Sequence, residues 1–590
     1  MPHIVIDGKL IEARTDETII QAALENNILI THYCWHPELS VAGNCRMCLV
    51  EVGLPKRLPD GTNQLDAEGK PVINYFPKLQ IACATPVSEG MHVRTISDTV
   101  IKAQEAVMEF LLINHPLDCP ICDEAGQCKL QEYAFLNSSA QSRFEEEKVH
   151  APKRVPWGQN ILFDGERCIK CSRCIRFAQE IAKQDVLTFV NRGDHVTIEQ
   201  FEGKEFDNPY SMNVIDLCPV GALTSKDFRF KSRVWDMSFN DSICPGCGRG
   251  CNIKLGVRNN QILRVEPRTN NYVNKYWMCD YGRLSHHKLV NENRVDTHMI
   301  RWKGDLINCS RDEAYSTAAD SLKKFEPNEI MFLGSAKATN EDNYLLARFA
   351  KEIIGSNNLD FLRHIDTNFA DDFLKVNEKA PNFAGAIETG VVPGPGGVSI
   401  EELADAIRFG KIKALYMMED DLSDFRYIRD ELDRLSLLIV HGSNLTKTVN
   451  LANVVFSSST YAEVEGTFTN IENRVQHFTP ALVTAENMRT MGMKMSRLDK
   501  FGAANDRWTQ HKLLNCRPNW RIITRLSQQL NSGWDYKNSR QVFDEIAEKI
   551  PSFKGMSYEL LDEFRGIQLG KASEPDAKVF IYESNYLKPH

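Results

Sequence analysis

The chain has 590 residues, of which 42% are hydrophobic and 25% are charged, and its formal net charge is −9. This length points to several domains, and the acidic balance argues against a nucleic-acid-binding protein, which is usually basic. No apolar run reaches the roughly 18 residues that a transmembrane helix needs. The first residues, Met1-Pro2-His3-Ile4-Val5, lack the features of an export or transit signal.

The cysteines are unevenly distributed along the chain. Fifteen of the 17 lie in residues 1–279, and only Cys309 and Cys516 lie in the other 311 residues. A disulfide framework needs an oxidising compartment, which no export signal supports here. Structural zinc usually takes two ligand pairs that are well separated in sequence. A [4Fe–4S] cluster more often takes three cysteines from one tight loop and a fourth from far away.

The fifteen cysteines sort into four groups, and each group supplies four ligands once one histidine is included. Group one is Cys34, Cys45, Cys48 and Cys83; group two is His115, Cys119, Cys122 and Cys128; group three is Cys168, Cys171, Cys174 and Cys218; group four is Cys244, Cys247, Cys251 and Cys279. Groups two to four each begin with C-x2-C and add a third cysteine within six residues. This spacing favours [4Fe–4S] clusters over zinc.

Group one lies in a segment whose pattern is typical of a small ferredoxin. Residues 4–6 and 10–11 flank Gly8-Lys9 and predict a hairpin, and a helix is expected to follow with Thr15 or Asp16 as its N-cap. Three thiols then come from one loop and the fourth from a later strand, which suits a [2Fe–2S] centre in a β-grasp domain. The turn-rich stretch 53–71 predicts a surface insertion.

Group two is one cysteine short of a complete site. His115 is the nearest candidate for the fourth ligand, four residues ahead of Cys119, and the helical pattern of residues 101–113 precedes it. An imidazole is neutral where a thiolate is negative, so this ligand would change the charge and the potential of the cluster.

Group three matches half of a two-cluster ferredoxin template, which repeats C-x2-C-x2-C-x3-C-P twice. The template positions of the second cluster hold Ala178, Asn208, Ser211 and Val214 instead of cysteine. One cluster therefore keeps all four ligands, ending at Cys218-Pro219, and the other has lost all four. We predict a ferredoxin-like domain that holds a single [4Fe–4S] cluster.

Group four and the second half of the chain resemble molybdopterin oxidoreductases. Group four matches their [4Fe–4S] entry segment, but Tyr281 stands where redox-active members commonly have lysine. Buried strands predicted at 330–333, 414–418, 437–440 and 454–456 alternate with helices and indicate a parallel α/β domain.

Residues 460–476 also resemble the molybdopterin family. A functional interpretation would have these loops and residues 390–397 grip a pterin, but a degenerate domain kept as a scaffold is the preferred interpretation. Cys309 lies in a context unlike a molybdenum ligand loop, and Cys309 and Cys516 are expected to be ordinary buried thiols.

The ordered set of these regions resembles the large iron–sulfur subunit of respiratory complex I. The stretches His36-Pro37-Glu38-Leu39 to Cys45-Arg46-Met47-Cys48 and His115 to Cys128 carry the resemblance most specifically, and the last hundred residues match least. The resemblance implies a multidomain α+β and α/β fold. Its expected domains are a [2Fe–2S] ferredoxin type at 1–95, a His-Cys₃ [4Fe–4S] domain at 96–137, a ferredoxin-like domain with one [4Fe–4S] cluster at 138–240, a [4Fe–4S] domain of molybdopterin-oxidoreductase type at 241–297, and a degenerate molybdopterin-oxidoreductase-like domain at 298–590.

The resemblance also implies a function. The chain would be an electron-transfer subunit of the proton-pumping NADH:quinone oxidoreductase, with one [2Fe–2S] and three [4Fe–4S] clusters and no molybdopterin. Electrons from a partner flavoprotein, which oxidises NADH at FMN, would pass through group one, then three, then two, toward quinone on other peripheral-arm subunits. Group four would lie off that path. No substrate site or catalytic residue is expected on this chain.

The expected location is the cytoplasmic side of a bacterial inner membrane, with only indirect membrane contact, because mitochondrial members lack group four. The alternatives are a relative of the catalytic subunit of NAD-linked formate dehydrogenase or of a hydrogenase, and a zinc-bound interaction scaffold. The formate dehydrogenase would keep all eight ferredoxin thiols and a lysine at position 281, and a hydrogenase would need further C-terminal cysteines.

Overall fold

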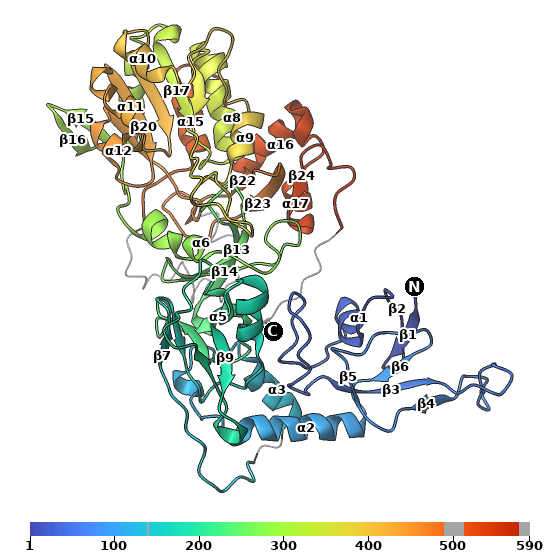
Figure 1. The fold of residues 1–590 in the computed structure, drawn as a ribbon. Helices are drawn as coiled ribbons and strands as arrows, with labels where there is room; N and C mark the ends of the chain where they lie inside the picture. The colour runs from blue at the N-terminus through green and yellow to red at the C-terminus, as the bar shows by residue number, and fades with distance from the viewer. Residues whose placement is uncertain (139–140, 489–512, 578–590) are drawn as a thin grey trace. The chain divides into compact units, whose positions relative to one another are not determined.

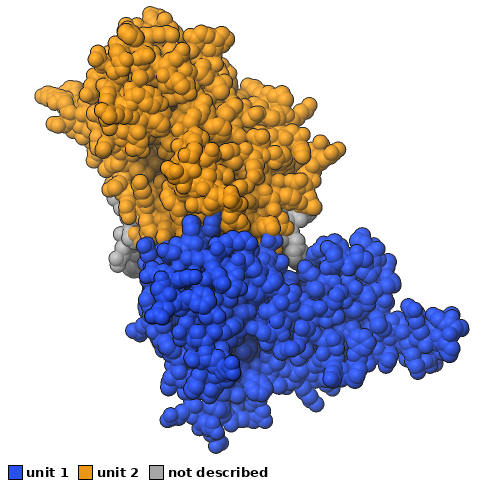
Figure 2. Space-filling view, in the orientation of Figure 1, with its two compact units in different colours: residues 1–235, 580–590 blue, residues 236–579 orange. Residues whose placement is uncertain are grey.

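The computed structural model describes residues 1–138, 141–488 and 513–577. The described chain forms two compact units that divide between Trp235 and Asp236, and they are coloured separately in Figure 2. Each unit is treated by itself below. In the described part of the chain no helix combines the length and the apolar character needed to cross a membrane.

The first unit begins with a mixed sheet around a short helix (Figure 1). Its strands are β1 (His3–Ile6), β2 (Lys9–Glu12), β3 (Leu49–Pro55), β4 (Ile73–Tyr75), β5 (Gln80–Ile81) and β6 (His92–Arg94). The predicted hairpin is confirmed, because β1 and β2 pair antiparallel, while β6 pairs parallel with β1. Residues 56–72 connect β3 to β4 and are mostly exposed, as the insertion prediction requires.

Helix α1 (Ile19–Glu25) begins later than predicted. Its N-cap is Thr18, not Thr15 or Asp16. The backbone N–H of Thr18 donates to Gln21 Oε1 at 2.9 Å, which closes a capping box that the earlier positions cannot form. Ile19, Ala22 and Ala23 are buried, so the predicted apolar face is correct.

Helices and small sheets build the rest of the first unit. They are α2 (Asp98–Ile113), η1 (Cys119–Ile121), α3 (Lys129–Asn137), β7 (Val155–Trp157), β8 (Ile161–Phe163), α4 (Arg173–Arg176), β9 (Leu187–Val190), β10 (Thr197–Gln200), α5 (Asn213–Leu217) and β11 (Leu223–Ser225). Helix α2 confirms the helix predicted before group two. Ala178 and Val214, at two of the four emptied ligand positions, are fully buried apolar residues, so the core fills space where a second cluster would need thiols.

The second unit opens with a small antiparallel sheet that carries group four. Its strands are β12 (Ser238–Ile243), β13 (Asn252–Arg258) and β14 (Gln261–Pro267), and α6 (Asp280–His286) follows them. Group four therefore spans the end of β12, the turn into β13 and the start of α6.

A seven-stranded sheet forms the centre of the second unit. Its strands, in spatial order, are β16 (Asp305–Asn308), β15 (Met299–Trp302), β21 (Val454–Ser457), β20 (Leu437–Gly442), β19 (Ala414–Met418), β17 (Ile330–Gly334) and β18 (Leu359–Phe361). The four predicted strands are present and pair in parallel with one another, so the predicted parallel α/β domain is confirmed. The strands β15 and β16 add an antiparallel edge next to β21.

Helices cover both faces of this sheet, because successive strand residues point to opposite faces. One face packs against α7 (Arg311–Leu322), α8 (Asn340–Arg348) and α15 (Asn519–Gln529). The other packs against α10 (Leu403–Arg408), α11 (Arg426–Arg429) and α12 (Lys447–Leu451). The remaining elements are α9 (Phe383–Glu388), β22 (Gly466–Thr469), β23 (Arg474–Phe478), α16 (Ser539–Lys549), α17 (Tyr558–Phe564) and β24 (Ile567–Gln568).

The two cysteines of the α/β domain differ in burial. Cys516 is buried, as predicted. Cys309 is only partly buried and packs against the margin of the core, just after β16 at the edge of the sheet. The prediction of a buried thiol is therefore wrong for Cys309, because an edge strand leaves its neighbours half covered.

Candidate metal centres

Group one is brought together by the loop that leads into β3 and by the turn after β5. The Cys34 thiol lies within hydrogen-bonding reach of the Cys45 and Cys83 thiols, and Cys48 lies within reach of Cys83. Hydrogen bonds from those two thiols and from the backbone amides of Asn44 and Cys45 lower the pKa of Cys34 far below its usual value. Converging sulfurs with amide donors suit a [2Fe–2S] cluster.

Group three lines an apolar cavity in the first unit. All four of its cysteines face this cavity, together with apolar side chains that include Phe163, Ile198 and Leu223. Burial raises the pKa of Cys168 to about 12 and those of Cys174 and Cys218 well above the usual value. Ionised thiolates at these positions need a positive partner such as iron.

The loop between the first three cysteines of group three has an unusual backbone. Lys170 and Ser172 both adopt left-handed conformations, with φ of 56° and 62°. Such conformations cost roughly 1–2 kcal/mol for a non-glycine residue. The backbone N–H of Lys170 donates to Cys168 Sγ at 3.4 Å. The left-handed conformations of these two residues turn the chain so that three sulfurs within seven residues face one cavity. The strained backbone therefore coincides with the predicted metal site.

Group two packs against the segment that follows Cys218. The backbone N–H of Lys129 donates to the Pro219 carbonyl at 3.1 Å, and a Cβ on Gly221 would collide with Cys122 Sγ. Glycine at 221 therefore permits the close approach of this thiol. Groups two and three are thus neighbours, because Cys218 belongs to group three and Pro219 and Gly221, which follow it closely, lie against Cys128 and Cys122 of group two.

The cysteines of group two interact electrostatically with one another, through the pairs Cys119–Cys122 and Cys122–Cys128. Burial lowers the pKa of His115 to about 4, so its imidazole is neutral at pH 7 and able to bind a metal. Its strongest charged neighbours are Arg167 and Lys148, and no contact between His115 and these thiols is among the described interactions. The role of His115 as fourth ligand stays a prediction.

Group four converges beside the start of α6. Burial raises the pKa of Cys251 well above its usual value, and the other three thiols of the group raise it further. The backbone N–H of Gly282 donates to Cys279 Sγ at 3.3 Å. A Cβ on Gly282 would lie 2.7 Å from Cys244 Sγ, so only glycine lets the helix start approach this site.

A lysine that sequence reasoning missed lies beside group four. Lys379 Nζ lies 4.0 Å from the ring centre of Tyr281 and 3.5 Å from that of Phe369. Electrostatic interactions also connect Lys379 with Cys247 and Cys279. The position two residues after the last cysteine has lost its lysine, but a positive charge from elsewhere in the chain stands over the tyrosine that replaced it.

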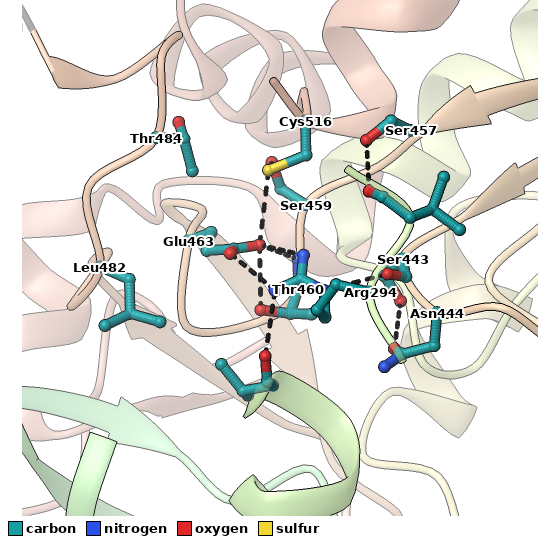
Figure 3. Close-up of polar contacts among 12 residues, drawn as sticks. Arg294, Ser443, Asn444, Ser457, Ser459, Thr460, Glu463, Leu482, Thr484 and Cys516 are labelled. Carbon is teal, nitrogen blue, oxygen red and sulfur yellow. Dashed lines mark hydrogen bonds and ion pairs between the residues drawn. The ribbon is translucent and has the colours of Figure 1, made fainter. Parts of the chain in front are cut away.

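The loops of the less favoured pterin-binding interpretation use polar groups in contacts within the protein. Arg294 Nη1 and Nη2 donate to the Glu463 carboxylate at 2.8 and 2.7 Å, and this carboxylate also accepts from the Thr460 amide at 2.8 Å (Figure 3). The Cys516 thiol lies 3.6 Å from the same carboxylate. Asn340 Nδ2 similarly donates to the Thr467 hydroxyl.

Two glycines of residues 390–397 are needed for close packing of the chain. Cβ atoms on Gly394 and Gly397 would collide with the side chain and the backbone of Asn357. These two glycines therefore allow two chain segments to touch, and they do not form an open cradle. The polar groups of these loops named above are therefore satisfied by partners within the described chain.

Family models match the chain in the predicted order of domain types. The matching descriptions are a 2Fe-2S iron-sulfur cluster binding domain at residues 2–98, an NADH-ubiquinone oxidoreductase-G iron-sulfur binding region at 104–142, a NADH-quinone oxidoreductase subunit 3 ferredoxin-like domain at 158–224, a molybdopterin oxidoreductase Fe4S4 domain at 237–291, and molybdopterin oxidoreductase at 372–491. The predicted multidomain fold class is confirmed by this order.

Curated relatives support the same resemblance. The G-type subunit of NADH-quinone oxidoreductase from Rickettsia conorii is 38% identical over 61% of this chain and 50% of its own length. Subunit 3 of the same enzyme from Thermus thermophilus is 36% identical over 60% of this chain and 46% of its own length. The 75 kDa subunit of NADH-ubiquinone oxidoreductase from Reclinomonas americana is 38% identical over 55% of this chain and 44% of its own length. The chain thus spans about half the length of these relatives.

Proposed function

We propose that this chain, a homologue of the large iron–sulfur subunit of NADH-quinone oxidoreductase, carries electrons from an NADH-oxidising flavoprotein toward quinone. It would hold one [2Fe–2S] cluster in group one and [4Fe–4S] clusters in groups two, three and four, with the sixteen predicted ligands. The matched models describe 2Fe-2S and 4Fe-4S binding regions over all four groups.

The consecutive contact of three groups carries this proposal. Group one adjoins group three, since Arg176 Nη2 donates both to the Cys34 carbonyl at 2.5 Å and to the Cys171 carbonyl at 3.4 Å. Group three adjoins group two, since Gly221 touches Cys122 three residues after Cys218. Electron transfer needs fixed, closely spaced centres, and the cluster supplies the redox chemistry while the protein sets its potential. The contacts support the order group one, group three, group two.

Burial is greatest at groups one and three, whereas Cys119 of group two is exposed. Cys34, Cys48, Cys83, Cys171 and Cys174 are all less than 10% exposed. Burial keeps the ligand set rigid and the surroundings apolar, so little reorganisation would accompany a change of charge. Group four lies in the second unit, outside this consecutive series, and we assign it a structural role.

Partners are proposed from the family. A flavoprotein that binds NADH and FMN would supply electrons, and other subunits of the peripheral arm would receive them. The chain would lie on the cytoplasmic side of a bacterial membrane and reach it through those subunits. The pterin loops close on themselves, so we propose that molybdopterin does not bind.

Metal analysis of the anaerobically purified chain tests this function. We expect about fourteen irons with matching sulfide per chain, from the sizes of the four cluster types. Low-temperature EPR during stepwise reduction should resolve one [2Fe–2S] and three [4Fe–4S] signals. Zinc in place of iron would favour the interaction scaffold, and stoichiometric molybdenum would favour the formate dehydrogenase relative; either result would contradict the proposal.

A further inference from the structure

Two arginines occupy the contact between groups one and three. Arg173 and Arg176 form the ends of α4, immediately around Cys174, and are 1% and 8% exposed. Buried charges are costly unless they are compensated. Their hydrogen-bond acceptors therefore indicate what compensates them.

Arg176 joins the two ligand loops through a single nitrogen. Its Nη2 donates to the carbonyl of Cys34 at 2.5 Å and to the carbonyl of Cys171 at 3.4 Å. Nη1 donates to the carbonyl of Ser40, and Nε donates to Ser172 Oγ at 3.2 Å. Two of these acceptors are the carbonyls of predicted cluster ligands, one in group one and one in group three.

Arg173 repeats the arrangement one residue away from the ligands. Its Nη2 donates to the Trp35 carbonyl at 2.5 Å, next to Cys34. Its Nη1 donates to the Leu217 carbonyl at 3.0 Å, next to Cys218. Both arginines therefore span the same pair of loops, but only Arg176 reaches the ligand residues themselves.

The charge of Arg176 has no ion-pair partner among the described residues. Its hydrogen bonds all go to carbonyls and one hydroxyl, and the nearest carboxylate that affects it, that of Glu180, bonds to Ser40 instead. A reduced iron–sulfur cluster with four thiolates is strongly anionic. The clusters are then the natural counter-charge for this guanidinium.

We propose that Arg176 is a positioning residue that fixes the group-one loop to the group-three loop, and that its charge raises the reduction potentials of both clusters together. This inference rests on the proposed clusters. A positive charge near a cluster favours the more negative, reduced state, and the low-dielectric interior strengthens the effect. One residue thus shifts the potentials of two consecutive centres in the same direction.

Redox titration of the full chain, loaded with its clusters and followed by low-temperature EPR, tests the inference. In Arg176→Gln, the ratio of reduced to oxidised cluster at a fixed ambient potential should fall by about tenfold for groups one and three, which equals about 59 mV for a one-electron couple. The group-four signal serves as the internal control and should not shift.

Arg249→Gln is the matched control variant. Arg249 lies within the group-four loop, donates to the Leu374 carbonyl at 3.1 Å, forms an ion pair with the half-exposed Glu472 and affects Cys251 electrostatically. Its replacement should shift group four and leave groups one and three unchanged. Arg176→Lys keeps the charge but not the fork of donors, so its two potentials should stay close to those of the wild type.

The outcomes separate this inference from the function. Shifts of groups one and three together in Arg176→Gln, restored in Arg176→Lys, support it. A shift of one group only, of all groups, or of none overturns it, and so does an equal shift in the glutamine and lysine variants. If the glutamine variant loads no clusters, the lysine variant is the deciding test. Unchanged potentials of groups one and three in Arg176→Lys then support the role of the charge, and shifted potentials overturn it. A wild-type chain that takes up no iron would instead contradict the proposed function itself.

Discussion

Two buried arginines, Arg176 in the first unit and Arg294 in the second, are compensated in different ways. In the first unit, buried thiols converge on common points and buried arginines donate to the carbonyls of the same loops, as Arg176 does to Cys34 and Cys171. In the α/β domain of the second unit, buried charges are paired within the protein, as Arg294 is with Glu463. The first arrangement leaves ionic capacity for a bound group, whereas in the second the charges of Arg294 and Glu463 compensate each other. The difference supports the proposal that the α/β domain is a scaffold attached to the cluster-binding regions.

Removal of one predicted ligand in the first unit should have the largest effect. In Cys174→Ala, the group-three cluster should be lost, because three thiolates hold a [4Fe–4S] cluster poorly. Iron per chain should fall by about four atoms relative to the wild type. Iron and sulfide analysis measures this change. Cys516→Ala is the control from the second unit and should keep the full iron content; equal iron in both variants would remove the distinction between the units.

Breaking a closed ion pair in the second unit should destabilise the protein without changing its iron. Arg294→Met leaves the Glu463 carboxylate buried without its partner, and such changes cost about 3–5 kcal/mol. Denaturant unfolding of the second unit measures the loss. Arg426→Met, at an exposed pair with Asp430, should cost about 0–1 kcal/mol.

The double variant Arg294→Met/Glu463→Leu sharpens this test. It should regain much of the stability, because no buried charge remains unpaired. Loss of iron from group four in Arg294→Met would show that the ion pair supports a cluster and would contradict the scaffold interpretation.

The ligand type in group two offers a smaller change within the first unit. His115→Cys replaces a neutral ligand by an anionic one, so the cluster should persist with a lower reduction potential. EPR-monitored redox titration measures the shift. His150→Cys, at an exposed histidine of the same unit, should leave every cluster potential unchanged. An unaltered group-two potential in His115→Cys would exclude His115 as a ligand.

The stability of the second unit should fall in acid because a neutral histidine is buried in its core. Burial lowers the pKa of His441 to about 3, and its ring bonds to Tyr416 and Asn519. The unfolded chain binds a proton near pH 6.5 and the folded chain does not, so stability present at pH 7 is lost as the pH falls from about 6.5 toward 3.

Protonation linked to His441 alone should lower the free energy of unfolding by about 1.4 kcal/mol for each pH unit between about pH 6.5 and pH 3. His441→Asn should be less stable at pH 7 but should lose less stability on acidification. Unfolding measured at pH 7, 6 and 5 checks this slope. His195→Asn, at an exposed histidine, should follow the wild type; a parallel slope in His441→Asn would contradict the argument.

Much of the fold followed from local patterns. The parallel strands β17, β19, β20 and β21 could be predicted, since a buried strand leaves a short continuous apolar run. The N-cap of α1 was placed wrongly, because Thr15, Asp16 and Thr18 are all good caps and the choice depends on which side chain closes a box with Gln21. The pattern Thr-x-x-Gln from Thr18 to Gln21 is a signal in the sequence that would have identified the correct cap.

The sequence by itself determined the candidate metal sites, because most of the thiols of a cluster come from one short loop and leave a spacing that can be read directly. Only the tertiary structure decided which groups touch. Arg176 donates to the carbonyl of Cys34, which lies 142 positions earlier in the chain. Lys379 packs over the ring of Tyr281, which also lies far from it in sequence. Such contacts leave no mark in the sequence, since every residue carries a carbonyl and the fold alone selects which one a distant side chain reaches.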